Sequence, residues 1–121
     1  MPLERGAVWL TRTLVTQQGG IPGLADKFVV VLQDPEQMDV GATSIAVLIA
    51  STDRTGGREP RAFEVRLGVE DGFDHSTIVD GRWVYTLLRA HLDEFDYRFT
   101  LSDDRMDDIG VAVFVGLQLA M

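Results

Sequence analysis

Two apolar runs, each followed by turn or loop residues, constrain the fold of this chain more than any other feature of its sequence. The first, Phe28–Gln33, ends at the turn signal Asp34-Pro35, and the second, Thr43–Ser51, leads into a charged loop. Both runs are interpreted as buried strands. Twelve glycines among 121 residues supply many turns, which favours a strand-rich fold over a helical bundle.

Weaker strand patterns flank these two runs. Residues Ala7–Val15 are rich in β-forming side chains, and Ala62–Gly68 alternates apolar with charged residues, as a half-exposed strand does. Ser76–Leu88 predicts two short strands that are broken or bent at Asp80-Gly81, and Tyr97–Leu101 can add another strand. The main loops are predicted at Thr16–Asp26 and Thr52–Pro60.

The end of the chain changes to a helical pattern. Ser102 is a good N-cap, and Asp103 and Asp104 would lie in the first turn, where the helix dipole favours anions. The predicted fold class is therefore mainly β, with residues 1–121 forming one domain, a small antiparallel barrel with a C-terminal helix. The apolar residues at helical spacing, which run as far as Leu119, are Met106, Ile109, Val113, Leu117 and, on the flank, Phe114.

Composition narrows the class of function. Apolar residues make up 45% of the chain and charged residues 25%, as in ordinary globular proteins. The sequence has no apolar segment long enough to span a membrane and no pattern of a signal peptide, so we expect a cytoplasmic protein without a membrane partner. It has no cysteine, which excludes disulfides, thiolate zinc sites and cysteine nucleophiles. The formal net charge of −8 opposes phosphate binding, so a nucleic-acid role would need a local basic patch.

Lys27 is the only lysine of the chain and stands between the glycine-rich loop and the first apolar run. A lysine in this place is usually a solvated strand end. The alternative is a cation held where the loop meets a substrate.

Four short motifs occur in an order that a known family shares. Arg5-Gly6 precedes a strand that contains Trp9, Lys27 precedes an apolar strand, Val47–Thr52 ends in a hydroxyl pair, and Leu101–Asp104 leads into the helix. In this order, over nearly the whole chain, the sequence resembles the MazF/PemK (Kid-like) toxins of type II toxin–antitoxin systems. The resemblance implies an SH3-like barrel, a fold that this family shares with CcdB.

The resemblance also implies an activity and its site. Members of the family are endoribonucleases that cleave single-stranded RNA without a cofactor, act as homodimers and are neutralised by a cognate antitoxin. The family's catalytic arginine matches Lys27, and its catalytic threonine matches Ser51, with Thr52 one residue further on. Lysine keeps the charge of arginine but not its planar fork, and Phe28 replaces the proline that follows in the family.

Such cleavage is a metal-free transesterification in which the 2′-hydroxyl attacks its own phosphate. The site must supply a cation for the phosphorane oxygens, and a hydroxyl or a base that positions the nucleophile and moves protons. Ser51 and Thr52 have these hydroxyls, or they simply end a strand by bonding the adjacent backbone. His75 is a conceivable general base and His91 a weaker one, and two histidines without paired spacing do not indicate a metal site.

The candidate RNA-binding residues are five arginines, one aspartate and two aromatic residues. The arginines could line an RNA groove, with Trp83 or Tyr85 as a stacking surface. Alternatively, acidic neighbours such as Glu64 neutralise them as ordinary surface charge. Asp80 either orients a basic residue or caps the turn at Gly81. Trp9 is expected in the core. The full set of candidates is Arg54, Arg58, Arg61, Arg66, Asp80, Arg82, Trp83 and Tyr85.

The sequence leaves two functions open for a protein of this fold. A third possibility is that the chain is an unrelated β-barrel binding protein. The first is a sequence-selective endoribonuclease toxin. The second is a catalytically degenerate binding module that acts through a protein partner, which the lost Arg-Pro pair and the acidic balance favour. In a nuclease, Lys27 and Ser51 should lie within reach of one phosphate. In a binding module that surface should be acidic or blocked by Phe28.

Overall fold

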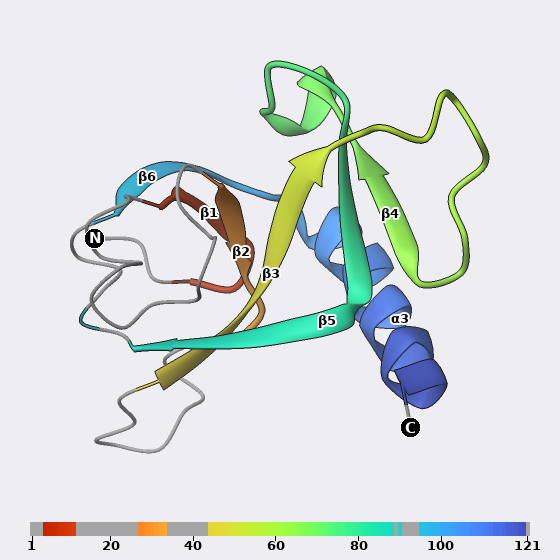
Figure 1. Ribbon diagram of the computed structural model, residues 1–121. Coiled ribbons are helices and arrows are strands. Elements are labelled where there is room, and N and C mark those ends of the chain that lie inside the picture. The colour runs from red at the N-terminus through yellow and green to blue at the C-terminus, as the bar shows by residue number, and fades with distance from the viewer. Residues whose placement is uncertain (1–3, 12–26, 34–43, 89, 91–94, 121) are drawn as a thin grey trace.

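The computed structural model describes residues 4–11, 27–33, 44–88, 90 and 95–120. Within these residues, six antiparallel strands form one curled sheet in the order β4-β5-β3-β2-β1-β6, and a long C-terminal helix packs against it (Figure 1). The predicted fold class, mainly β with a C-terminal helix, is confirmed. The elements are β1 (Ala7–Leu10), β2 (Phe28–Val31), β3 (Ser44–Thr52), β4 (Glu64–Leu67), the 3-10 turn η2 (Val69–Asp71), β5 (Thr77–Leu88), β6 (Asp96–Thr100) and α3 (Asp103–Ala120).

Strands β2 and β3 form the centre of the sheet, as their apolar runs predict. They pair antiparallel, so that Phe28 at the start of β2 lies opposite Ala50 near the end of β3. Antiparallel pairing therefore brings the residue before β2, which is Lys27, to the same end of the sheet as Ser51 and Thr52. This register determines the position of the candidate site.

The sheet has a hydrophobic cluster on each face, because successive side chains of a strand point to opposite sides. Val30 and Leu48 belong to the cluster that α3 covers, whereas Val29 and Val47 belong to the other. Trp9 is 1% exposed in the second cluster, which confirms its expected place in the core.

The prediction of two strands within Ser76–Leu88 is wrong, because β5 is one continuous strand of twelve residues. It does bend sharply near the predicted position (Figure 1). Leu48 of β3 pairs with Val84, but Ala50, two residues later, pairs with Val79, so β5 carries extra residues at this point. Extra residues in one strand bend the pair locally, which gives a turn of direction without ending the strand.

Helix α3 begins as predicted, but only part of its apolar spacing is buried. The hydroxyl of Ser102 accepts a hydrogen bond from the Arg105 backbone N–H at 3.2 Å, which is the expected N-cap. Met106 and Ile109 are buried as expected. Leu117, however, differs from these two and is 45% exposed.

Close packing of two glycines explains this difference. A Cβ atom added to Gly116 of α3 would lie 2.5 Å from the carbonyl carbon of Gly81 in β5. A Cβ atom added to Gly81 would lie 2.3 Å from the carbonyl oxygen of Ala112. The helix therefore contacts the strand backbone through its smallest residues, and the larger Leu117 is turned outward.

Several predicted boundaries differ by a few residues. Strand β1 ends at Leu10, and β2 ends at Val31, shorter than Phe28–Gln33. Strand β3 extends one residue beyond the prediction, to Thr52. The last residues of the predicted first strand, 12–15, and the predicted loop of residues 16–26 lie outside the described residues.

Candidate active site

A cavity of about 140 Å³ opens where β2 begins and β3 ends. It gathers all three residues predicted as catalytic, Lys27, Ser51 and Thr52, and adds His75 from the loop before β5. The other lining residues are Phe28, Ala50 and Thr77. The cavity therefore combines a cation, two hydroxyls and an imidazole, and Phe28 forms part of its wall.

Lys27 is held in place through its backbone. Its N–H donates to the hydroxyl of Thr11 at 3.1 Å, while its carbonyl accepts from the Thr11 N–H at 2.9 Å and from the Thr11 hydroxyl at 3.1 Å. Thr11 is itself buried, at 1% exposure. The Lys27 side chain is exposed, and among the described residues no carboxylate lies within ion-pair distance of its ammonium group. An anchored backbone with an ammonium that no described carboxylate pairs suits a phosphate ligand.

The two hydroxyl residues end β3. Ser51 lies opposite Ile78 of β5, and Thr52 lies opposite Thr77. Neighbouring residues of a strand point to opposite faces of the sheet, and the side chains of both are exposed here. Ser51 also lines a second cavity, described below.

Thr52, His75 and Asp74 form a hydrogen-bonded series. The Thr52 hydroxyl oxygen lies 3.1 Å from Nε2 of His75, and Nδ1 of His75 is hydrogen-bonded to the Asp74 carboxylate. Because an ionised carboxylate only accepts hydrogen bonds, Asp74 places the ring proton on Nδ1. Nε2 of the neutral imidazole then carries the lone pair and accepts from Thr52. The basic nitrogen of His75 thus faces the cavity residues.

Asp53 connects the segments that carry this series. Its carboxylate accepts from the backbone N–H and hydroxyl of Thr55 (2.9 and 2.6 Å), from Nε of Arg66 (2.7 Å) and from the hydroxyl of Ser76 (2.9 Å). Its backbone N–H donates to the carbonyl of Ser76 at 3.0 Å. The hydrogen bond from the Thr55 hydroxyl, followed by the others, holds the pKa of Asp53 well below its usual range. Asp53 therefore stays ionised and fixes the residue next to His75.

The candidate arginines fall into two groups. Arg58 pairs with Glu64 at 2.8 Å, Arg66 pairs with Asp53 at 2.7 Å, and Arg82 pairs with Asp80 at 2.8 Å, so acidic neighbours neutralise these three. Arg54 and Arg61 are exposed and form no ion pair with the part of the chain that the structure describes.

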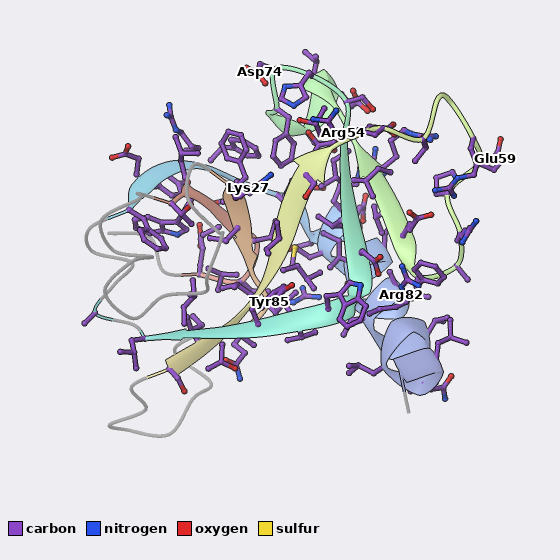
Figure 2. All side chains as sticks on the ribbon, viewed as in Figure 1. Lys27, Arg54, Glu59, Asp74, Arg82 and Tyr85 are labelled. Atoms are coloured by element: carbon purple, nitrogen blue, oxygen red, sulfur yellow. The ribbon has the colours of Figure 1, made fainter. Side chains whose placement is uncertain are left out.

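Figure 2 locates the charged loop relative to the cavity. Arg54 lies at the tip of β3, whereas Glu59 lies on the outer bend of the loop, away from Lys27. Of the loop arginines, Arg54 is also the one nearest in sequence to the hydroxyl pair Ser51-Thr52. The Asp80 carboxylate accepts from the Arg82 backbone N–H at 2.9 Å and also binds the Arg82 guanidinium.

A second cavity, of about 310 Å³, adjoins the first and brings together Asp80, Trp83 and Tyr85. Ser51 lines both cavities, so they share a wall. Trp83 is 58% exposed there. A third cavity, of about 360 Å³, shares Phe28 with the first and is otherwise lined by Gly72, Phe73, Asp74, Arg98 and Phe99.

Sequence reasoning missed Asp74 and Asp53 as parts of the site. The adjacent Asp74-His75 pair is visible in the sequence. Its hydrogen bond with Thr52 joins segments that are distant in the sequence, and no sequence pattern indicated it. His91 lies outside the described residues. Among the residues that the structure describes, no group of three His, Asp or Glu side chains could hold a metal ion. None of the described helices is both long and apolar enough to cross a membrane.

Comparisons with known proteins show which solved structures share this fold. No model of a protein family matches the chain, and no curated protein matches its sequence. Solved structures do match. One is an endoribonuclease in complex with its cognate antitoxin from a mycobacterial species, with a TM-score of 0.70 and 18% identity over 98% of this chain and 97% of that chain.

Two further structures agree. The Mycobacterium tuberculosis toxin MazF-mt6 has a TM-score of 0.66 and 12% identity, over 93% of this chain and 96% of that one. The MazE–MazF structure from Deinococcus radiodurans has a TM-score of 0.63 and 16% identity, over 99% and 96%. The curled sheet and C-terminal helix thus have the fold of these toxin and endoribonuclease structures. More particularly, the chain has the MazF fold, as the sequence resemblance predicted.

Proposed function

We propose that this protein belongs to the MazF/PemK family and is the toxin of a type II toxin–antitoxin system, a metal-independent endoribonuclease that cleaves single-stranded RNA at selected sequences. One observation carries the proposal. On a MazF fold, the cavity at the start of β2 gathers the Lys27 cation with Ser51, Thr52 and the imidazole of His75. These are the groups that transesterification of RNA requires.

In the proposed mechanism, His75 acts as the general base. RNA binding places the 2′-hydroxyl at Nε2 of His75, where Thr52 donates its hydrogen bond in the free protein. Nε2 takes the proton of the 2′-hydroxyl, and the oxygen attacks the adjacent phosphorus. Asp74 holds the ring orientation and stabilises the imidazolium that forms.

Lys27 and the hydroxyls stabilise the charge that develops on the phosphate. The Lys27 ammonium lies beside the phosphorane oxygens, and Ser51 and Thr52 donate hydrogen bonds to them. The bond from phosphorus to the 5′-oxygen then breaks, and this oxygen takes a proton from water at the open cavity. The products are a 2′,3′-cyclic phosphate and a 5′-hydroxyl end.

The acidic chain must attract RNA locally rather than by its net charge. Arg54, at the tip of β3, and Arg61, which follows the loop in sequence, are exposed and form no ion pair with described residues, and we infer that they supply that local charge. The paired arginines, Arg58, Arg66 and Arg82, position carboxylates and contribute less. RNA binding by this surface should therefore weaken with salt, with a shallow dependence.

The partners follow from the same assignment. Structures with the same fold contain an antitoxin, as in the mycobacterial complex and the MazE–MazF structure, and we infer a cognate antitoxin for this chain. We also infer a cytoplasmic homodimer. A set of apolar side chains on the outer side of α3 supports a contact between copies: Val111, Phe114, Leu117 and Leu119 are each at least 45% exposed.

The test is incubation of a long, mixed-sequence RNA with purified protein in EDTA, followed by mapping of the product ends. The proposal predicts cleavage at a few sites, with 5′-hydroxyl ends and cyclic phosphates. Intact RNA from a folded protein over a range of concentrations would contradict it and favour the binding module that acts through a protein partner.

A further inference from the structure

The second cavity has a defined place on the sheet beside the candidate active site. Strand register places Ser51 opposite Ile78 and Glu64 opposite Asp80, so these four side chains come from adjacent strands, β3, β5 and β4. Ile49, two residues before Ser51, points to the same face. The cavity holds about 310 Å³ and shares Ser51 with the cavity of Lys27.

The size and the apolar lining residues of this cavity suit a flat aromatic ring. Ile49 and Ile78 are half-buried, and Tyr85 and Trp83 complete the lining from β5. Trp83 exposes 58% of its surface, although a large aromatic side chain usually gains by burial. Exposed aromatic rings beside a nucleic-acid groove are stacking surfaces for unpaired bases. Figure 2 shows Tyr85 and Arg82 on β5, and Lys27 at the start of β2.

The charged groups of the cavity are two carboxylates. Asp80 is bound by Arg82, and Glu64 is bound by Arg58. The hydrogen bond from Arg58 lowers the pKa of Glu64, so its carboxylate stays ionised and only accepts hydrogen bonds.

Glu64 has acceptor capacity to spare. Its Oε1 atom accepts from Arg58 at 2.8 Å and from the Arg61 N–H at 3.0 Å. Its Oε2 atom, among the described residues, accepts only one long hydrogen bond, from Arg58 at 3.3 Å. A ligand with a hydrogen-bond donor on its edge can use this oxygen.

We propose that this cavity binds one base of the RNA next to the scissile phosphate, and that Glu64 and Asp80 select a base that bears an amino group. The inference rests on the proposed function, which supplies RNA as the ligand. Cytosine, adenine and guanine present amino hydrogens to a carboxylate. Uracil has no amino group, and its one edge donor, N3–H, lies between two carbonyl oxygens that a carboxylate repels. Cytosine and uracil therefore form the sharpest pair for comparison, because they have nearly the same size and shape.

Fluorescence of Trp83 provides a readout that does not need cleavage. The chain has two tryptophans, and Trp9 is 1% exposed, so quenching by an added oligonucleotide reports on Trp83. The probes are 2′-O-methyl oligo(C) and oligo(U) of equal length, which cannot undergo attack by the 2′-oxygen. Oligo(C) should quench the fluorescence and bind roughly tenfold or more tightly than oligo(U). Equal affinities, or binding without quenching, would overturn the proposal.

Two variants separate stacking from selection, with thermal unfolding as the check on folding. Trp83→Ala should weaken oligo(C) binding about tenfold or more, and Trp83→Phe, which keeps a ring, should restore most of it. Glu64→Gln keeps the size of the side chain and should reduce the preference for cytosine to less than about threefold. A Glu64→Gln protein that folds and keeps the full preference would also overturn the proposal.

The binding assay distinguishes this inference from the proposed activity. If the protein leaves RNA intact but binds oligo(C) selectively at Trp83, the base site stands and the nuclease assignment fails. If it cleaves RNA but shows neither quenching nor preference for cytosine, the nuclease assignment stands and the base site is wrong.

Discussion

The hydroxyl oxygen of Thr52, at the end of β3, lies 3.1 Å from Nε2 of His75, in the loop before β5. Asp74 bonds the other ring nitrogen of His75. The two residues are 23 positions apart in the chain and meet because the end of β3 pairs with the start of β5. This contact turns a strand end with two hydroxyls into a site that can also move a proton.

His75 should therefore be required for cleavage. His75→Gln is expected to lower kcat by about 10²–10⁴-fold, because the substitution removes the general base. Asp74→Asn should lower kcat less, since the base remains but loses its orientation. Unchanged kinetics in His75→Gln would contradict the assigned role.

Lys27 should act through its charge. Lys27→Ala is expected to lower kcat/KM for RNA by about 10²-fold or more, because the phosphorane loses its cation. Lys27→Arg should keep most of the activity, since a guanidinium also binds phosphate oxygens. Steady-state kinetics on one defined oligonucleotide would give both ratios. An alanine variant as active as the parent protein would show that Lys27 is only a solvated strand end.

The glycine contact between α3 and β5 predicts opposite effects from one substitution at two places in the same helix. Gly116→Ala should lower the free energy of unfolding by about 1–3 kcal/mol, because its Cβ atom has no room against Gly81. Gly110→Ala should raise that free energy by about 0.5–1 kcal/mol, since alanine favours a helix and the nearest atom, on Arg5, is 3.9 Å away. Urea unfolding measures both, and equal effects would contradict the packing described.

Asp53 should make stability depend on pH in acid. The pKa of Asp53 in the folded protein lies below the usual value of 3.8. Its contribution to stability is therefore complete above pH 3.8 and is lost as the pH falls from there through the folded-state pKa. The free energy of unfolding should decrease between about pH 5 and pH 2, and Asp53→Asn should decrease less over the same range. Urea unfolding at several pH values checks this. Parallel curves for the two proteins would show that the hydrogen bonds of Asp53 do not favour its ionised form.

Local sequence pattern was sufficient for most of the fold. The apolar runs at Phe28–Gln33 and Thr43–Ser51 became the central strands, and the Ser102 cap began the helix. The pattern failed where contacts between distant segments decide. The close approach of Gly81 and Gly116 turned Leu117 outward, and no periodicity within the helix encodes the position of β5.

The candidate site divides in the same way. Lys27, Ser51 and Thr52 could be grouped in advance because the family resemblance supplied their alignment, and they share one cavity. The Asp74–His75 pair and the hydrogen bonds of Asp53 could not be placed, since they depend on the pairing of β3 with β5. Ion pairing of Arg58, Arg66 and Arg82 was likewise one of two alternatives until the positions of their carboxylate partners were known.

The measurement that tests the central claim most directly compares two oligonucleotides in EDTA. One is all-ribose and contains a mapped cleavage sequence, and the other carries a single 2′-deoxynucleotide on the 5′ side of the scissile phosphate. The proposed mechanism predicts that the protein cleaves the first to a cyclic phosphate and a 5′-hydroxyl, and binds the second without cleaving it. Cleavage of both oligonucleotides, or cleavage that EDTA abolishes, would contradict attack by the 2′-hydroxyl in a metal-independent site.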